Sequence, residues 1–157
     1  MIDDLYSAKL LNLAANMPRV GRLAAPDASV EKVAKLCGSR VLVDVVVDGE
    51  RVADFAQEVK ACALGQAAAS VLGSQVVGAS LPELEVAVRQ FRAMLKDGAS
   101  APDGRFSDLA MLAPVKDYPA RHASTLLAFE AVTEAVRQAM GRASAKTTGR
   151  TSPAGAA

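Results

Sequence analysis

The chain has 157 residues, of which 51% are hydrophobic and 4% aromatic, and it contains no tryptophan. This length is enough for one compact domain with a core of Ala, Val and Leu side chains, but hardly enough for two. The net charge of +1 comes from interspersed acidic and basic residues, so no basic stripe or acidic tail indicates binding to nucleic acid or to an anionic membrane.

The beginning of the chain lacks the pattern of a signal peptide, because Asp3 and Asp4 stand where a basic cluster would be needed. No stretch approaches the roughly 20 apolar residues of a membrane-spanning helix. We therefore expect a cytoplasmic protein. Its two cysteines, Cys37 and Cys62, are too few for a disulfide framework. In a reducing compartment they are free thiols, ligands or simply buried side chains.

The first half of the chain predicts one helix and a small group of strands. In order, these are a helix over residues 3–16, ended by Pro18; a strand over 29–35; and a hairpin of strands 41–47 and 51–59. The hairpin prediction depends on a β-branched run and on Asp48-Gly49, which is a typical dipeptide of two-residue turns.

The chain after the hairpin predicts helices. They are expected over residues 63–77, from Ser80 to Gly98, from Ser107 to Met111, and from Pro119 to about Met140. The second of them begins with the capping-box sequence Ser80-Leu81-Pro82-Glu83. Residues 141–157 have no periodic apolar face and are predicted to be a disordered tail.

Strands followed by helices predict an α+β fold, in which helices cover one face of a small antiparallel sheet of about three strands. We expect residues 1–140 to form this single domain.

Three residues with possible ligand chemistry lie at element boundaries. Cys37 precedes the first hairpin strand, next to Gly38, which allows a tight turn. Cys62 lies where the strand changes to helix, and His122, the only histidine, lies in the first turn of the last helix. No CxxC or HxxxH pair is present. The residues alone therefore leave open that both cysteines are inert buried side chains.

Five motifs, in order over about residues 5–140, give a more specific interpretation. They are LYSAKLLNLAANMPRVGRL, LCGSR, VDVVVDGERVADF, ACALGQAAAS and YPARHASTLLAFEA. In this order and separation they resemble the iron–sulfur cluster assembly scaffold family (NifU N-terminal/IscU/SufU-like). The resemblance implies that Cys37 and Cys62 are the first two metal or cluster ligands. It also implies that they approach each other near the start of the last helix.

The chain departs from the family pattern at the other ligand positions. Ser124 stands in place of the third cysteine, and Ser39 in place of an aspartate after Cys-Gly. A hydroxyl does not replace a thiolate as a ligand of a soft metal. In one branch of the family a histidine directly precedes the third cysteine. Here that position is Ala123, and His122 lies one residue earlier, about 100° away around a helix. His122 is thus either a third metal ligand or a solvated helix-start residue.

The resemblance implies a scaffold or carrier that binds iron or a transient iron–sulfur cluster, and sulfur, through Cys37 and Cys62. It has no catalytic residue and is not an enzyme. Its cofactor would be a transient cluster or zinc, or none, and its partners a cysteine desulfurase and recipient apoproteins. Two alternatives remain. In one, Cys37 is a SufE-like acceptor of persulfide sulfur from the desulfurase; in the other, the chain is a degenerate paralogue that only docks.

Overall fold

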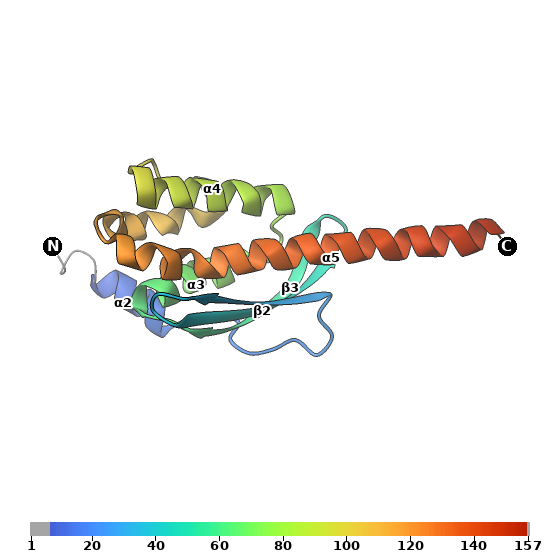
Figure 1. Ribbon diagram of the computed structural model, residues 1–157, viewed down its shortest axis with the longest axis horizontal. Helices are drawn as coiled ribbons and strands as arrows, with labels where there is room; N and C mark the ends of the chain where they lie inside the picture. The colour runs from blue at the N-terminus through green and yellow to red at the C-terminus, as the bar shows by residue number, and fades with distance from the viewer. Residues whose placement is uncertain (1–6, 157) are drawn as a thin grey trace.

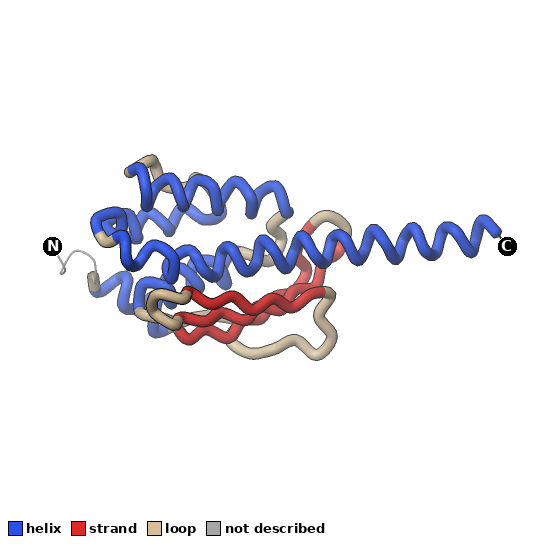
Figure 2. Tube along the Cα trace, in the orientation of Figure 1, coloured by secondary structure: helices blue, strands red, loops and turns tan. Residues whose placement is uncertain are grey.

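The computed structural model describes the backbone of residues 7–156 and the side chains up to Arg142. An antiparallel sheet has the order β1-β2-β3, formed by Ala28–Ala34, Ser39–Asp48 and Arg51–Lys60. Helices cover one face of the sheet, and a loop that precedes β1 runs along the other side (Figure 1, Figure 2). The predicted α+β fold with a three-stranded antiparallel sheet is confirmed.

The hairpin forms where the sequence predicts it, but its turn lies one residue later. Asp48 pairs with Arg51, so the two turn residues are Gly49 and Glu50. Gly49 has a φ of +63°, whereas Glu50 has no positive φ. A glycine at the first central position is the pattern of a type II′ turn, whose twist fits the flanking strands. Asp48 is therefore the last strand residue rather than a turn residue.

The described helices follow the hairpin, apart from one at the start. They are α2 Ala8–Ala15, α3 Ala63–Gln75, α4 Leu81–Asp97 and α5 His122–Ala156, with 3₁₀ helices η1 Gly104–Asp117 and η2 Pro119–Arg121. The predicted first helix began at residue 3; residues 3–6 lie outside the described part, and Ser7 caps α2 by accepting from the N–H of Leu10.

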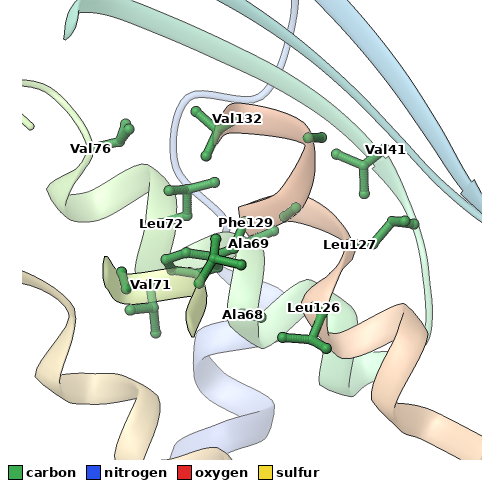
Figure 3. Packing of buried hydrophobic residues seen from close by; sticks show 14 of the residues in the cluster. Val41, Ala68, Ala69, Val71, Leu72, Val76, Leu126, Leu127, Phe129 and Val132 are labelled. Carbon is green, nitrogen blue, oxygen red and sulfur yellow. The ribbon is translucent and has the colours of Figure 1, made fainter. Parts of the chain in front are cut away.

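Helix α5 is central to the core because it contacts β1, β2, α3 and α4. Figure 3 shows the buried side chains that meet there, most of them Ala, Val and Leu. Three phenylalanines join the outer elements to α5. Phe129 packs edge-to-face against Phe91 of α4 and Phe106 of η1, with ring centroids 5.5 and 5.1 Å apart.

The segment after α4 differs from the prediction. We expected Ser107 to cap a short helix ending at Met111; instead 3₁₀ turns run from Gly104 to Asp117, with a kink at Phe106, where the backbone is not helical. The buried side chains of this segment recur every third residue, which is the period of a 3₁₀ helix, where residues i and i+3 lie on one face. They are Phe106, Leu109, Leu112 and Val115. This spacing of three is present in the sequence and differs from the spacing of an α-helix.

The predicted end of the last helix at about Met140 is wrong, since α5 continues through Gly141 to Ala156. A glycine within a helix costs about 1 kcal/mol relative to alanine. It ends the helix only where the backbone turns left-handed, and Gly141 has no positive φ. Figure 1 shows this end of α5 projecting beyond the sheet. Disorder of residues 141–157 in solution stays a prediction.

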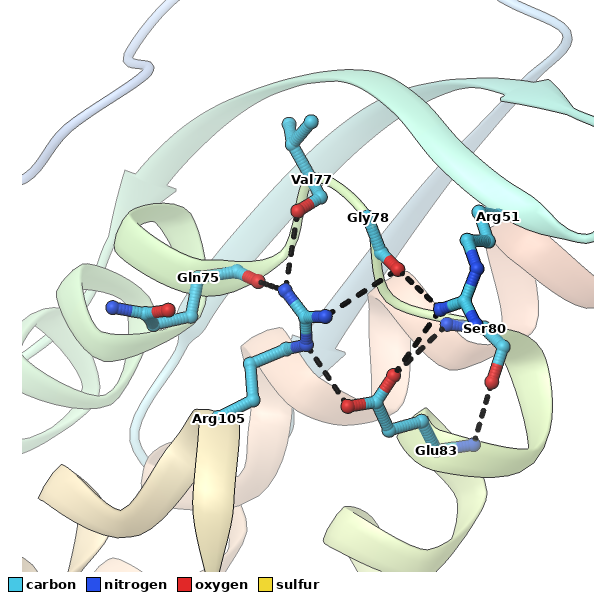
Figure 4. A network of polar contacts seen from close by, with 7 residues as sticks. All are labelled: Arg51, Gln75, Val77, Gly78, Ser80, Glu83 and Arg105. Carbon is cyan, nitrogen blue, oxygen red and sulfur yellow. Dashed lines mark hydrogen bonds and ion pairs between the residues drawn. The ribbon is translucent and has the colours of Figure 1, made fainter.

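The junction between α3 and α4 is fixed by the predicted capping box and by two arginines (Figure 4). Ser80 and Glu83 exchange both bonds of the capping box. Arg105 donates to the carboxylate of Glu83 at 2.9 Å and to the carbonyl oxygen of Gln75 at 2.7 Å. Arg51 donates to the carbonyl oxygen of Gly78 at 2.7 Å. These bonds satisfy carbonyl groups that the end of α3 leaves without helical partners.

On the other side of the sheet, a buried carboxylate anchors the loop before β1. The side chain of Asp44 is fully buried, and Arg22 donates to its two oxygens at 2.7 and 3.0 Å. The N–H of Leu23 and the hydroxyl of Ser29 also donate to it. Burial alone would raise the pKa of Asp44, but these hydrogen bonds and the Arg22 charge outweigh it and hold the pKa below its usual value.

Replacing this carboxylate should therefore destabilise the fold. Asp44→Ala should lower the free energy of unfolding by about 1–3 kcal/mol near neutral pH, because Arg22, the N–H of Leu23 and the hydroxyl of Ser29 lose a charged acceptor. Glu31→Ala is the matched control: Glu31 forms an exposed ion pair with Arg40 at 3.8 Å, which should contribute at most about 1 kcal/mol. Denaturant titration measures both.

The wild type and Asp44→Ala also test the pH dependence of stability. Because the folded-state pKa of Asp44 is lowered, its stabilisation is complete above the unfolded value of about 3.9. It is lost as the pH falls through the folded-state pKa. The stability difference between wild type and Asp44→Ala should thus shrink on acidification. A difference that stays constant down to the acid unfolding of both proteins would contradict this role of Asp44.

Candidate functional site

The two cysteines lie at the same end of the sheet. Cys37 lies in the turn from β1 to β2, followed by Gly38 with a φ of +74°. Cys62 is the N-cap residue of α3, directly after β3. The last facing residues of β2 and β3 at this end are Arg40 and Lys60. Cys37 lies three residues before Arg40, and Cys62 lies two residues after Lys60. Both cysteines therefore follow the same end of the hairpin ladder.

Ser124 is the third element of the site. It is buried near the start of α5, and its Oγ lies 3.7 Å from the Sγ of Cys62. The same hydroxyl donates to the carbonyl oxygen of Arg121 at 3.2 Å. The residue at the position of the family's missing cysteine therefore does face the thiols.

Ser39 is the second hydroxyl of the site. It is buried at the start of β2, and its Oγ lies 3.0 Å from the Sγ of Cys37. Hydrogen bonds from the side chain and backbone of Ser39, and a weaker one from Ser124, lower the pKa of the Cys37 thiol. Cys37 is exposed, whereas Cys62 is half-buried. Cys37 is thus the accessible thiol, and hydroxyls surround it where the family pattern has an aspartate and a cysteine.

A close approach of two helices fixes the positions of Cys62 and Ser124. Gly65 lies in the first turn of α3, where a Cβ would be 2.9 Å from the Cβ of Ala61 and 3.0 Å from the carbonyl oxygen of Ser124. Real Cβ atoms do not tolerate such distances, so any larger residue would push the start of α3 away from α5. Gly65 therefore sets the separation of the second thiol from the hydroxyl.

His122 is placed differently from both readings of the sequence. It is buried rather than solvated, with 7% of its surface exposed. Its Nε2 lies 2.9 Å from the carbonyl oxygen of Val115 and 3.2 Å from that of Lys116. Carbonyl oxygens only accept, so Nε2 carries the hydrogen and is unavailable to a metal. No described hydrogen bond joins His122 to Cys37 or Cys62, and its contacts give the ligand role no support.

Within residues 7–156, no group of three or more His, Cys, Asp or Glu side chains is placed to hold a metal ion. The site consists instead of two thiols and two hydroxyls. Thiolates bind soft and borderline metals, whereas neutral hydroxyls are poor ligands for them.

Leu36 lies beside the site, and the sequence analysis assigned it no role. Leu36, next to Cys37, is 77% exposed, the largest value among the exposed large hydrophobic residues of the described chain. A large apolar side chain that is not needed for the core can contribute to a docking surface. The signal in the sequence was a leucine in a short turn, outside any periodic pattern.

If His122 has this structural role, its removal should affect stability rather than metal binding. His122→Ala should lower the free energy of unfolding by about 1–3 kcal/mol, because the carbonyl groups that close η1 lose a buried donor. The zinc affinity of the folded variant, measured by competition with a chromogenic chelator, should equal that of the wild type. A clear fall in zinc affinity would instead assign His122 as a ligand.

None of the helices in the described range is both long enough and apolar enough to cross a membrane. The comparisons with known proteins agree on a family. The family model described as the NifU-like N terminal domain matches residues 5–125. The iron–sulfur cluster assembly scaffold protein IscU of Thermotoga maritima is 26% identical over 136 residues, which cover 85% of this chain and 94% of the relative.

Two solved structures are similar over most of their length. The crystal structure of a nitrogen-fixing NifU-like protein (N-terminal) from Brucella abortus shares 50% identity, with a TM-score of 0.87, and the match covers 89% of this chain and 97% of that one. A putative iron–sulfur cluster assembly scaffold protein for the SUF system from Fervidobacterium islandicum shares 22% identity over 85% of this chain and 98% of its own, with a TM-score of 0.77, and supports the fold alone. Since the family model covers well over half of the sequence, this protein belongs to the NifU-like N-terminal domain family.

Proposed function

We propose that this protein is a scaffold or carrier in iron–sulfur cluster assembly, which holds iron or a transient cluster, and sulfur, through Cys37 and Cys62. The observation that carries the proposal is the position of Ser124. Its Oγ lies 3.7 Å from the Sγ of Cys62, and its hydroxyl contributes to lowering the pKa of Cys37, which supports a shared site at one end of the domain. The family membership and the scaffold relative from Thermotoga maritima support the same function.

The two-thiol site predicts weak and transient binding. A tetrahedral zinc site, or a closed cluster with two iron atoms, takes four protein ligands, and this chain offers two cysteines. A second subunit, a partner or water would supply the remaining ligands of the bound iron or cluster. An incompletely held cluster is easily passed on, which suits a carrier that does not itself catalyse a reaction.

We infer that the partners are a cysteine desulfurase, which supplies sulfur, and apoproteins that receive the cargo. The exposed Cys37 beside the exposed Leu36 supports a contact with such a partner at this turn. The activity would lie in the cytoplasm, where reducing conditions keep both thiols free.

Reconstitution without oxygen tests the scaffold function. With ferrous iron and sulfide, the wild type should bind weakly, and Cys37→Ser or Cys62→Ser should abolish binding. Ser124→Cys adds a thiolate at the third position and should bind at least about tenfold more tightly, since even changes outside the ligand shell alter metal affinity by about 10–100-fold. Bound iron and acid-labile sulfide are measured directly.

Ser74→Cys is the matched control. Ser74 is exposed near the other end of α3, about 18 Å along the helix from Cys62, so its thiol cannot join the site. Equal gains from Ser74→Cys and Ser124→Cys would mean adventitious binding. No gain from Ser124→Cys would contradict a shared ligand site.

The SufE-like alternative has its own support in the accessible Cys37 and its lowered pKa. Thiolates, rather than thiols, attack sulfane sulfur. With a cysteine desulfurase and cysteine, mass spectrometry should therefore find one added sulfur on Cys37 before any on Cys62. Labelling of Cys37 without cluster binding favours the acceptor, and no labelling of either cysteine favours the paralogue that only docks.

A further inference from the structure

We propose that Cys37 and Cys62 form a reversible intramolecular disulfide, a covalent modification site that small-molecule disulfides of the glutathione class create. A disulfide needs Cα atoms about 4.4–6.8 Å apart. Residues that face each other in an antiparallel ladder are separated by about 4.5–5.5 Å. The hairpin ladder ends at Arg40 and Lys60. Cys37 lies three residues before Arg40 and Cys62 two residues after Lys60, so both cysteines follow the same end of the ladder, where separations of this size are within reach.

The turn that carries Cys37 can adjust to the bond. The N–H of Gly38 donates to the carbonyl oxygen of Ala34 at 2.8 Å and closes the turn, and a Cβ at Gly38 would meet no atom within 4 Å. Cys37 is exposed and is not among the buried residues of the core. Its side chain therefore has room to rotate, whereas Cys62 is held at the start of α3.

Ser124 holds the two sulfurs around one point. Its Oγ is 3.7 Å from the Sγ of Cys62, and the same hydroxyl is among the groups that lower the pKa of Cys37. In a relative with a third cysteine at this position, three thiols would compete for the same bond. Here only one pairing exists within the chain, because it has only two cysteines.

The exchange takes place in two steps. The thiolate of the accessible Cys37 attacks one sulfur of RS–SR, forming a Cys37–SR bond and releasing RS⁻. The thiolate of Cys62 then attacks the Cys37 sulfur, forming the Cys37–Cys62 bond and releasing the second RS⁻. The two thiol protons of the protein end on the two RS⁻ groups. The protein loses two electrons, and the small disulfide is reduced to two thiols.

The consequence for cargo rests on the proposed function: the oxidised site offers no thiolate, so it binds neither iron nor sulfane sulfur until a thiol reduces it. Formation of the disulfide itself does not depend on that function.

The test uses the full-length, metal-free, reduced protein with oxidised glutathione as the probe, quenched in acid. The intact mass should fall by two hydrogen atoms without a retained glutathione. Trypsin separates the cysteines, since Cys37 lies in the fragment 36–40 and Cys62 in 61–89. Digestion without reductant should therefore give these two fragments joined, and reductant should release them.

Two variants test the order of the steps. Cys62→Ser should stop at a stable glutathione adduct on Cys37, and Cys37→Ser should react at Cys62 at least about tenfold more slowly, since access limits thiol exchange. Thermal unfolding checks that both variants are folded. A wild type that keeps glutathione on Cys37, or forms only links between two chains, would overturn the proposal. Cluster binding by the reduced protein is measured separately, so either idea can fail alone.

Discussion

The close contact between the first turn of α3 and the start of α5 is the constraint on which the site depends. A Cβ at Gly65 would lie 3.0 Å from the carbonyl oxygen of Ser124, so a larger residue there would fit only if the two helices moved apart. Alanines continue this close packing along both helices, which is how a chain with 4% aromatic residues fills its core. Since Cys62 caps α3 and Ser124 lies in the first turn of α5, helix packing fixes their separation.

Local signals made much of the fold predictable. The hairpin and the capping box each depend on a few neighbouring residues with a known backbone preference. The predictions of the hairpin turn and of the segment after α4 were wrong because another backbone preference competed with the expected one. The turn settled on Gly49 because a positive φ is needed at the first central position, and η1 follows a period of three that resembles an irregular helix.

Contacts between distant segments were not predictable in the same way. The pairing of Arg22 with Asp44 joins residues 22 positions apart. The sequence offered only an indirect signal, an aspartate within the apolar run VLVDVVV. A charge inside a strand of this kind needs a partner, but the sequence does not say which one. The burial of His122 against the carbonyl groups of η1 was missed for the same reason, because it depends on how two segments pack.

The replacement of two ligands by serine changes the chemistry of the site without emptying it. Both hydroxyls lie against sulfur, with Ser39 beside Cys37 and Ser124 beside Cys62. A hydroxyl donates a hydrogen bond to a thiolate, which stabilises the anion, but it adds no charged soft ligand for a metal. In the proposed function, these serines leave Cys37 with a lowered pKa and predict weaker metal binding than a site with a third thiolate would have. An exposed Cys37 and a half-buried Cys62 therefore fit the proposed transfer of sulfur, or the proposed exchange with a disulfide, better than they fit durable storage of a cluster.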